Sequence, residues 1–386
     1  MSTLFTGIGS LALTGERFGE IEMVENAALA VSGGKVIYSG SAAGAPVCDE
    51  TVDVDGRSVI PGFVDSHSHL MFAGERSEEF SSRITGKPYA AGGIRTTVKA
   101  TRSASDDELR ENAKSLINEF YASGITQFEI KSGYGLDVET EVRSLKIASE
   151  LTEHTTFLGA HVVPEGVERA EYITLLTGEM VQAVRPYAKW IDVFCDQGAF
   201  TAVEAKEILQ AGIAAGLKPR MHANQIANIG AIPVALELGC ASVDHCTHLS
   251  PEDITLLSGS ETVVTLLPGA EFSTKSPYPD GRRLASAGIT LAIATDCNPG
   301  SSYTTSMPFC IAIAVREMGL SPDQALWATT RGGAKALRTN GGSLQVGERA
   351  DFVVLDAPTH IYLSYRPGVQ LVSATYVGGK KVFERN

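Results

Sequence analysis

The sequence predicts an α/β fold: a closed (β/α)8 barrel of the TIM type, with a small β-sandwich domain formed by both ends of the chain. Apolar strand-like runs alternate with helical stretches eight times between residues 59 and 318, as a parallel barrel requires. Polar residues follow nearly every run, at the strand ends where barrel active sites lie. An open doubly wound sheet is the alternative, but no G-x-G-x-x-G motif follows an early strand.

The first 60 residues read as short strands separated by turns. The expected strands cover 27–32, 35–38 and 52–54, with glycines in the turns between them. The C-terminal part repeats this style over 350–355, 370–377 and 380–383. Glycine turns flanked by β-branched residues are typical of hairpins. We therefore expect residues 1–58 and 345–386 to form one composite β-sandwich domain, and residues 59–344 to form the barrel.

The eight strand–helix units of the barrel follow in order along the chain. They are expected at 59–67 with 106–122, 125–131 with 138–151, 156–163 with 170–187, 190–195 with 202–215, 218–222 with 232–238, 241–245 with 251–257, 262–267 with 282–287, and 290–295 with 307–318. Continuous apolar strands of this kind are typical of a parallel sheet covered by helices. A further helix near 321–337 is expected to link the barrel back to the β domain.

Composition excludes several classes of function. The 386 residues carry a formal charge of −13, which argues against nucleic acid or an anionic membrane surface as partner. A small anionic substrate stays possible, because a few cations in a cleft can outweigh a distant negative surface. Six cysteines without a C-x-x-C pair indicate a reducing compartment. With neither a signal-peptide pattern nor a long apolar run, we expect a cytoplasmic protein.

The segment Val64-Asp-Ser-His-Ser-His69 closes the first apolar run. Alternation along a strand places His67 and His69 on one face, so both imidazoles can bind one ion. Such a pair on its own can be an accident of a strand end. Further ligand types follow later strands, however: His161 the third, His222 and Gln225 the fifth, His245 the sixth and Asp296 the eighth. Five of the eight histidines therefore fall on one predicted rim, which favours a metal site.

Each of these residues also has a simpler interpretation. His222 could be a buried core histidine, although the polar Asn224 and Gln225 follow it directly. Asp296 could cap the next helix, which does not exclude metal ligation. Cys297 could suggest a nucleophile, but without a neighbouring base we interpret it as packing. The remaining histidines, at 154, 248 and 360, are expected to lie outside the site.

Several longer segments are more specific than these single residues. They are Pro61-Gly-Phe-Val-Asp-Ser-His-Ser-His69, Phe72-Ala-Gly-Glu-Arg-Ser-Glu-Glu-Phe80, Lys131-Ser-Gly-Tyr-Gly-Leu136, Thr156-Thr-Phe-Leu-Gly-Ala-His161, Asp192-Val-Phe-Cys195 and Thr295-Asp-Cys-Asn-Pro-Gly300. Over nearly the whole chain they resemble the amidohydrolase superfamily of metal-dependent hydrolase barrels, and within it the imidazolonepropionase family. The resemblance implies hydrolysis of the ring amide of 4-imidazolone-5-propanoate to N-formimidoyl-L-glutamate, a step in histidine degradation.

The resemblance also implies roles for individual residues. The ligands of one divalent metal, zinc or iron, would be His67, His69, His222 and Asp296. The fourth strand, 190–195, has no lysine that could be carboxylated to bridge a second metal, so a mononuclear site is expected. The catalytic residues would be Asp296, His245 and Gln225, with Gln225 hydrogen-bonding a ring nitrogen. The substrate-binding residues would be Arg76, Tyr134, His161, Gln225, Asn298, Gly300 and Ser301, with Arg76 binding the propionate.

The sequence departs from the family pattern at three places. The segment 86–94 is shorter than the loop expected in many members, Gln225 stands where a Glu can occur, and Ser301 stands where Thr is common. A Gln cannot act as a base.

The alternative functions are those of a related deaminase of another small heterocycle and, more distantly, of a non-catalytic barrel scaffold. The resemblance further suggests a homodimer.

Overall fold

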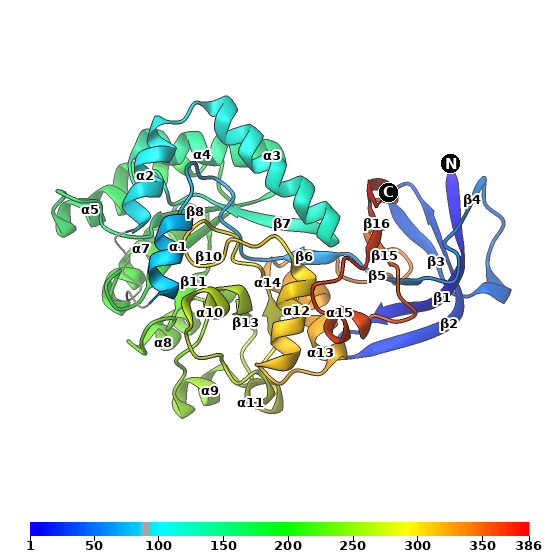
Figure 1. Ribbon diagram of the computed structural model, residues 1–386. Helices are drawn as coiled ribbons and strands as arrows, with labels where there is room; N and C mark the ends of the chain where they lie inside the picture. The colour runs from blue at the N-terminus through cyan, green and yellow to red at the C-terminus, as the bar shows by residue number, and fades with distance from the viewer. Residues whose placement is uncertain (86–92, 386) are drawn as a thin grey trace.

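In the computed structural model, which describes residues 1–85 and 93–385, eight parallel strands form the predicted barrel (Figure 1). In barrel order they are β6 (Phe63–Asp65), β7 (Ile125–Lys131), β8 (His154–Ala160), β9 (Trp190–Cys195), β11 (Met221–Ala223), β12 (Ser242–His245), β13 (Val263–Leu266) and β14 (Leu291–Ile293). The short β10 (Lys218–Pro219) also pairs with β9. The first and last strands meet where the His69 amide donates to the Cys297 carbonyl at 2.9 Å, so the barrel is nearly closed.

Helices cover the outside of the barrel and largely follow the predicted boundaries. Those expected are α3 (Asp106–Ser123), α4 (Val138–Leu151), α5 (Arg169–Leu175) continued by a π-helical segment and α6 (Val181–Val184), α7 (Ala202–Ala214), α8 (Ala231–Glu237), α9 (Pro251–Leu257), α11 (Gly281–Ser286) and α12 (Met307–Arg316). The linking helix at 321–337 is present as α13 (Pro322–Trp327), a π-helical segment and α14 (Gly333–Ala336). The sequence alternation is thus confirmed.

Several of these helices begin where the sequence supplies a capping box. At the start of α3, α7, α9 and α13, a Ser or Thr side chain accepts a hydrogen bond from the backbone amide three residues later. The acidic or amide side chain of that later residue in turn accepts a hydrogen bond from the backbone amide of the Ser or Thr. The capping residues are Ser105, Thr201, Ser250 and Ser321. Each box satisfies amides that a helix start leaves without partners, which fixes where the helix begins.

Four short helices were not expected. α1 (Ser77–Ile84) and α2 (Ile94–Ser103) lie in the connection after the first barrel strand, where no helix was expected before residue 106. α10 (Pro268–Thr274) follows β13, and α15 (Tyr362–Tyr365) interrupts the C-terminal strands. Residues 86–92, which hold most of the segment expected to be a shortened loop, lie outside the described residues. No described helix has the length and apolarity needed to cross a bilayer.

The two chain ends pair with each other, as expected, and they form one mixed sheet, in which Figure 1 places both termini. Its strands are β1 (Ser2–Thr14), β2 (Ile21–Ser32), β3 (Lys35–Ser41), β4 (Glu50–Asp53), β5 (Ser58–Pro61), β15 (Phe352–Leu355), β16 (Val372–Val377) and β17 (Lys380–Glu384). The long β1 was missed in the sequence, although it pairs with β2, β4 and β5. The sheet has its own core, in which Phe5 packs against Phe352 and Tyr376.

The expected first barrel strand, 59–67, is divided between the two parts of the fold. β5 pairs with β1 and β15 in the terminal sheet, whereas β6 pairs with β7 in the barrel. Gly62 alone separates them, and a side-chain carbon there would lie 2.3 Å from Oγ1 of Thr126. Glycine is required at this close approach. The division into domains at residues 58 and 345 stays a prediction.

Candidate metal centre and active site

The predicted ligands His67, His69 and Asp296 meet at one point inside the barrel. The Nε2 atoms of the two histidines are 3.2 Å apart, and each lies 3.4 Å from Oδ1 of Asp296. A tetrahedral ion with ligands at about 2.0–2.1 Å has ligand–ligand distances of about 3.3–3.4 Å. The three atoms therefore match one face of the coordination tetrahedron of a zinc-sized ion, which makes these residues fit a divalent metal.

His222, the fourth predicted ligand, lies beside this face. Its ring centroid is 4.4 Å from that of His67. The ligand atoms of His67, His222 and His245 also lie within 4.8 Å of one another. The structure thus brings together two overlapping, fully buried sets that share His67. Imidazole and carboxylate are ligands that zinc and iron accept, so the cluster is consistent with a metal site.

The backbone is strained at the ends of the barrel strands, near the residues of the cluster. Asn224, His245 and Asp296 have φ angles of 52°, 74° and 51°, in the left-handed region that non-glycine residues rarely adopt. Such strain clusters at functional sites, where the surrounding structure imposes it. Asn224 directly follows β11, His245 is the last residue of β12, and Asp296 lies shortly after β14.

Asp65 joins the first and last strands beneath the cluster. Its carboxylate accepts from the Thr295 hydroxyl at 2.5 Å and from the Thr295 amide at 3.2 Å. Burial raises the pKa of Asp65 to about 7, in spite of these hydrogen bonds. The contact fixes the spacing between the segment that carries His67 and the one that carries Asp296.

Two carboxylates orient the ligand imidazoles. Nδ1 of His67 lies 2.8 Å from Oδ2 of Asp244, and Nδ1 of His222 lies 3.0 Å from Oδ2 of Asp192. A carboxylate at Nδ1 favours the tautomer that carries its proton there, which leaves Nε2 unprotonated for a metal. Both rings therefore present the nitrogen that the cluster needs.

These two carboxylates belong to a buried charge network made of Glu129, Lys131, Asp192, Arg220 and Asp244. All five side chains are fully buried, and their ion-pair distances run from 2.7 to 3.5 Å. Three carboxylates against two cations leave one excess negative charge, and Asp296 adds a second. Buried charge that lacks a counter-charge is costly, so a divalent cation is the species that would balance this site.

Burial also sets the protonation of the histidines. It holds the pKa of His67, His69 and His161 well below the usual value, and lowers the pKa of His245 to about 3. These imidazoles are neutral at pH 7, the form in which they ligate metals. Burial raises the pKa of Asp296, while His245 and His222 oppose the rise. Burial would likewise raise the pKa of Asp192, but His222 and Lys131 outweigh it and hold that pKa well below the usual range.

The loop after β14 is organised by Asn298. Its amide nitrogen donates to the Asp296 carbonyl at 2.6 Å, and its Oδ1 accepts from the amides of Gly300 and Ser301 at 2.8 Å. The Ser301 hydroxyl in turn donates to Oδ2 of Asp296 at 3.3 Å. The Asn298 side chain therefore holds the loop in shape, and Ser301 reaches the free oxygen of the predicted ligand.

Arg76 lies at the other side of this loop and is almost fully buried. Its guanidinium forks onto Glu79, with Nε–Oε2 and Nη2–Oε1 distances of 2.8 and 2.6 Å. Its Nη1 edge packs over Gly300, where a side-chain carbon would lie 2.3 Å from Nη1. Arg83, which the sequence analysis missed, donates twice to the Gly300 carbonyl at 3.1 Å. Gly300 is thus enclosed by two arginines.

Nearly all of the predicted site residues line one enclosed pocket. It contains His69, Arg76, Tyr134, His161, His222, Gln225, His245, Asp296, Asn298 and Ser301, together with Ile94, Phe194 and Ile226. His67 is fully buried next to the lining residues, and Gly300 lies against Arg76, which lines the pocket. His161 donates from Nδ1 to the Gly133 carbonyl at 3.0 Å, which orients its ring beside His69. The structure therefore gathers every predicted site residue; their individual roles stay predictions.

The residues expected to lie outside the site do so. His154 is buried near Lys189, and burial lowers its pKa to about 3. His360 bonds to Asp323 at 2.7 Å. Cys297 packs in the core, where burial raises the pKa of its thiol well above the usual value. An inert, protonated thiol fits the packing interpretation.

The charged residues behind the ligands were the main omission of the sequence analysis. Glu129 and Lys131 lie in β7, Asp192 lies in β9, Arg220 lies between β10 and β11, and Asp244 directly precedes His245 in β12. A charge within a buried strand needs a partner, so these charges are a signal that could have found the network.

Comparison with known sequences agrees with this site. The model of the amidohydrolase family matches residues 58–383. An imidazolonepropionase from Streptomyces griseus subsp. griseus is 52% identical over 387 residues, covering 99% of each chain. One from Mycolicibacterium smegmatis is 53% identical, covering 99% of this chain and 98% of that one. One from Salinispora arenicola is 55% identical over 377 residues, covering 96% of each.

Solved structures share the fold at much lower identity. Guanine deaminase from C. acetobutylicum, with bound guanine, has a TM-score of 0.73 and 15% identity, covering 99% of this chain and 100% of that one. A mutant atrazine chlorohydrolase from Arthrobacter aurescens, complexed with zinc and atraton, has a TM-score of 0.74 and 18% identity, covering 99% and 95%. At such identity the likeness concerns the architecture alone.

Proposed function

The chain belongs to the amidohydrolase family and, within it, to the imidazolonepropionases; from this premise we propose that it hydrolyses the ring amide of 4-imidazolone-5-propanoate to N-formimidoyl-L-glutamate. It is a metal-dependent hydrolase with a buried His and Asp cluster. The observation that carries the proposal is the match between the site and this substrate. A cluster that fits a metal and a guanidinium suited to a carboxylate line the same pocket.

We propose His67, His69, His222 and Asp296 as the ligands of one divalent ion, zinc or iron. When bound, the ion supplies Lewis acidity, which lowers the pKa of a coordinated water toward ~7. Lys131 forms ion pairs with Asp192 and Glu129 at 2.7 and 2.9 Å. A lysine held in this way does not bridge a second metal, which supports a mononuclear site. A homodimeric assembly remains a prediction from the resemblance, and a cytoplasmic location remains a prediction from the sequence composition.

Asp296 and His245 would carry the proton transfer and the charge. Asp296 would accept the proton of the attacking water on a carboxylate oxygen and deliver it to the leaving ring nitrogen. His245, neutral at pH 7, would donate an N–H to the amide carbonyl and stabilise the tetrahedral oxyanion, a contribution of roughly 3 kcal/mol for a well-placed donor. The backbone strain at both residues supports a fixed orientation during these steps.

The remaining pocket residues would bind and orient the substrate. Arg76 would bind the propionate through its guanidinium, with Tyr134 and His161 lining the same pocket. Gln225 lines the pocket and would hydrogen-bond a ring nitrogen; its backbone amide is fixed by Asp196 at 2.5 Å. The loop made by Asn298, Gly300 and Ser301 would close the remaining side.

The direct test is incubation of the metal-loaded protein with freshly generated imidazolone propionate. Loss of the substrate's ultraviolet absorbance, abolished by a chelator and restored by metal, is the expected result. Release of ammonia during turnover would instead identify a deaminase, since ring opening of the imidazolone releases none. An absence of turnover at any metal loading would contradict the proposal and favour the scaffold alternative.

A further inference from the structure

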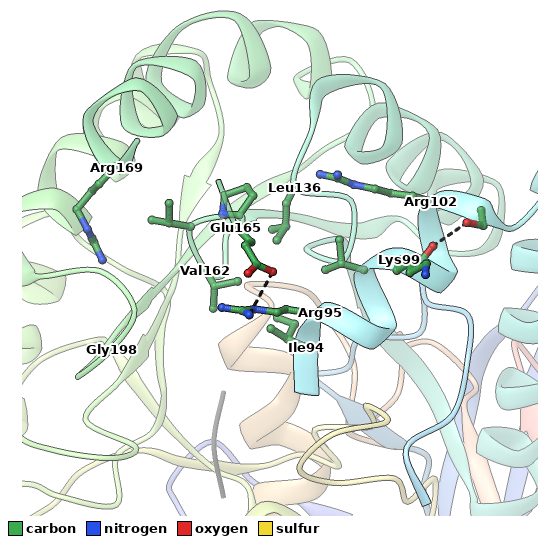
Figure 2. Close-up of a pocket in the computed structure, with 13 residues that line it drawn as sticks. Ile94, Arg95, Lys99, Arg102, Leu136, Val162, Glu165, Arg169 and Gly198 are labelled. Carbon is green, nitrogen blue, oxygen red and sulfur yellow. Dashed lines mark hydrogen bonds and ion pairs between the residues drawn. The ribbon is translucent and has the colours of Figure 1, made fainter. Parts of the chain in front are cut away.

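A groove of about 580 Å³ lies between α2 and the segment that follows β8 (Figure 2). Its floor is apolar and includes Ile94, Val98, Leu136 and Val162. Nothing in the proposed chemistry of the metal cluster uses this groove. Its size and its apolar floor would accommodate a small organic molecule rather than a bare ion.

The rim of the groove is cationic. Arg95, Lys99, Arg102 and Arg169 line it, against one lining carboxylate, Glu165. Figure 2 shows Arg95 beneath Glu165, with Arg102 on one side and Arg169 on the other. This arrangement stands on a protein whose formal charge is −13, so the groove departs from the character of the whole surface.

The arginines of the rim are already paired, whereas the lysine is not. The pairs are Arg95 with Glu165 at 3.1 Å, Arg102 with Asp137 at 2.9 Å and Arg169 with Glu204 at 2.9 Å. Among the residues that the structure describes, no carboxylate forms an ion pair with Lys99, and its side chain is exposed. Lys99 therefore carries the excess positive charge of the rim.

The groove adjoins the catalytic pocket. Ile94 lines both of them. Two connecting segments also pass from one to the other within a few residues: Tyr134 lines the pocket and Leu136 the groove, and His161 lines the pocket and Val162 the groove. A molecule held in the groove is thus next to the wall of the reaction site.

We propose that the groove is a capture site for small carboxylates, in which Lys99 binds the propionate of the substrate before the ring passes Ile94 into the catalytic pocket. The carboxylate would then exchange Lys99 for Arg76, and the apolar floor would contact the ring and methylene groups. This inference rests on the proposed function, because that function supplies the anionic substrate.

The capture site would act by electrostatic attraction of the anionic substrate. The net negative charge repels an anionic substrate at long range, and a local cluster of cations at the entrance raises the substrate concentration there. Such an effect acts on association rather than on chemistry. It is also weakened by salt, since the Debye length falls from about 10 Å at 0.1 M to about 3 Å at 1 M.

The test is a comparison of two charge reversals in the metal-loaded enzyme, Lys99→Glu in the groove and Lys380→Glu in β17 of the terminal sheet. Both lysines are exposed, and each substitution changes the net charge by the same amount. For Lys99→Glu we expect kcat/KM to fall about five- to tenfold at low ionic strength, with kcat within about twofold of wild type. The deficit should shrink to below about twofold near 0.5 M salt.

Two kinetic results would overturn the capture site. One is an equal fall of kcat/KM in both variants, which would assign the effect to net charge alone. The other is a loss that persists unchanged at high salt. A selective, salt-sensitive loss in Lys99→Glu supports the proposal, and Lys99→Ala should then lie between wild type and Lys99→Glu.

Direct binding separates the groove from the reaction. Titration calorimetry with 3-(imidazol-4-yl)propanoate, which has the same tail but no ring amide, would be done on Arg76→Ala and on Arg76→Ala with Lys99→Glu. We expect salt-sensitive binding to the first variant that is at least about fivefold weaker in the second. Equal binding would exclude the groove. If wild type fails to consume the imidazolone while this difference persists, the proposed function fails and the carboxylate site stands.

Discussion

The Asp244 carboxylate lies 2.8 Å from Nδ1 of His67, so the first histidine of the cluster turns its Nε2 toward His69 and Asp296. Asp244 is itself held by the buried charge network, since Nη2 of Arg220 lies 3.5 Å from the same oxygen. The orientation of the predicted ligand His67 is therefore set by the Asp244 carboxylate, which is not among the residues that line the pocket.

We expect Asp244→Asn to weaken metal binding by about 10- to 100-fold, because the substitution removes a buried negative charge and its amide can donate to Nδ1 of His67. Competition with a chelator measures the affinity. Asp351→Asn, a buried carboxyl in the terminal part of the chain, is the matched control and should leave the affinity unchanged. Equal affinity in Asp244→Asn and wild type would show that this carboxylate does not orient the ligand.

Asp296→Ala should abolish turnover, with a loss of at least about 100-fold, because proton transfer and a predicted ligand disappear together. Asp296→Asn retains an oxygen at the position of the ligand but cannot take the proton, so it separates the two roles. It should bind metal in the chelator competition while remaining inactive in the absorbance assay. Wild-type rates in Asp296→Ala would refute the mechanism.

Arg76→Ala should raise KM by about 10- to 100-fold with a smaller change in kcat, as expected for loss of a charge-assisted contact to the propionate. Gly300→Ala offers an independent approach, since its new carbon would lie 2.3 Å from Nη1 of Arg76 and displace the guanidinium. Steady-state kinetics should give the same KM-dominated defect for both. A pure kcat defect would place Arg76 outside substrate binding.

Glu271 predicts a pH dependence of stability. Burial, aided by the charge of Asp296, raises its pKa from 4.5 to about 8, while a hydrogen bond from Thr247 opposes the rise. Below pH 4.5 both the folded and the unfolded chain are protonated at this site. As the pH rises toward 8 only the unfolded chain releases the proton, so the folded state loses stability, by at most about 5 kcal/mol at about 1.4 kcal/mol per pKa unit.

Glu271→Gln should therefore match wild type near pH 5 and exceed it in unfolding free energy near pH 8. Urea denaturation at the two pH values measures the difference. Glu207→Gln, an exposed position on α7, controls for the loss of one formal charge. Parallel pH profiles for Glu271→Gln and wild type would show that the carboxyl ionises freely in the folded protein.

The sequence was sufficient for the barrel because its signal is local and periodic. The apolar strands and capped helices from β7 to α12 follow the expected boundaries within a few residues, since each is fixed by its own pattern and caps. The same periodicity places five histidines and Asp296 at strand ends, which is why a metal site could be predicted. The choice of His67, His69, His222 and Asp296 as its ligands came from the family resemblance.

What the sequence did not reveal depends on long-range pairing. β1, which was missed, pairs with β4 and β5, more than 30 residues away, as well as with the neighbouring β2. The charge network was missed because Lys131 pairs with Asp192, and Arg220 with Glu129, only when the barrel brings their strands together. The Lys99 groove likewise depends on how α2, itself unexpected, lies against the segment after β8.

The single residue between β5 and β6 couples the two parts of the protein mechanically. Gly62 lets one stretch of chain pair first in the terminal sheet and then in the barrel, and His67 lies just after β6. Melting of the terminal sheet would therefore release the segment that carries the first two ligands. We expect one cooperative thermal transition rather than two, and metal binding, which favours the folded state by mass action, should protect the distant chain termini from proteolysis.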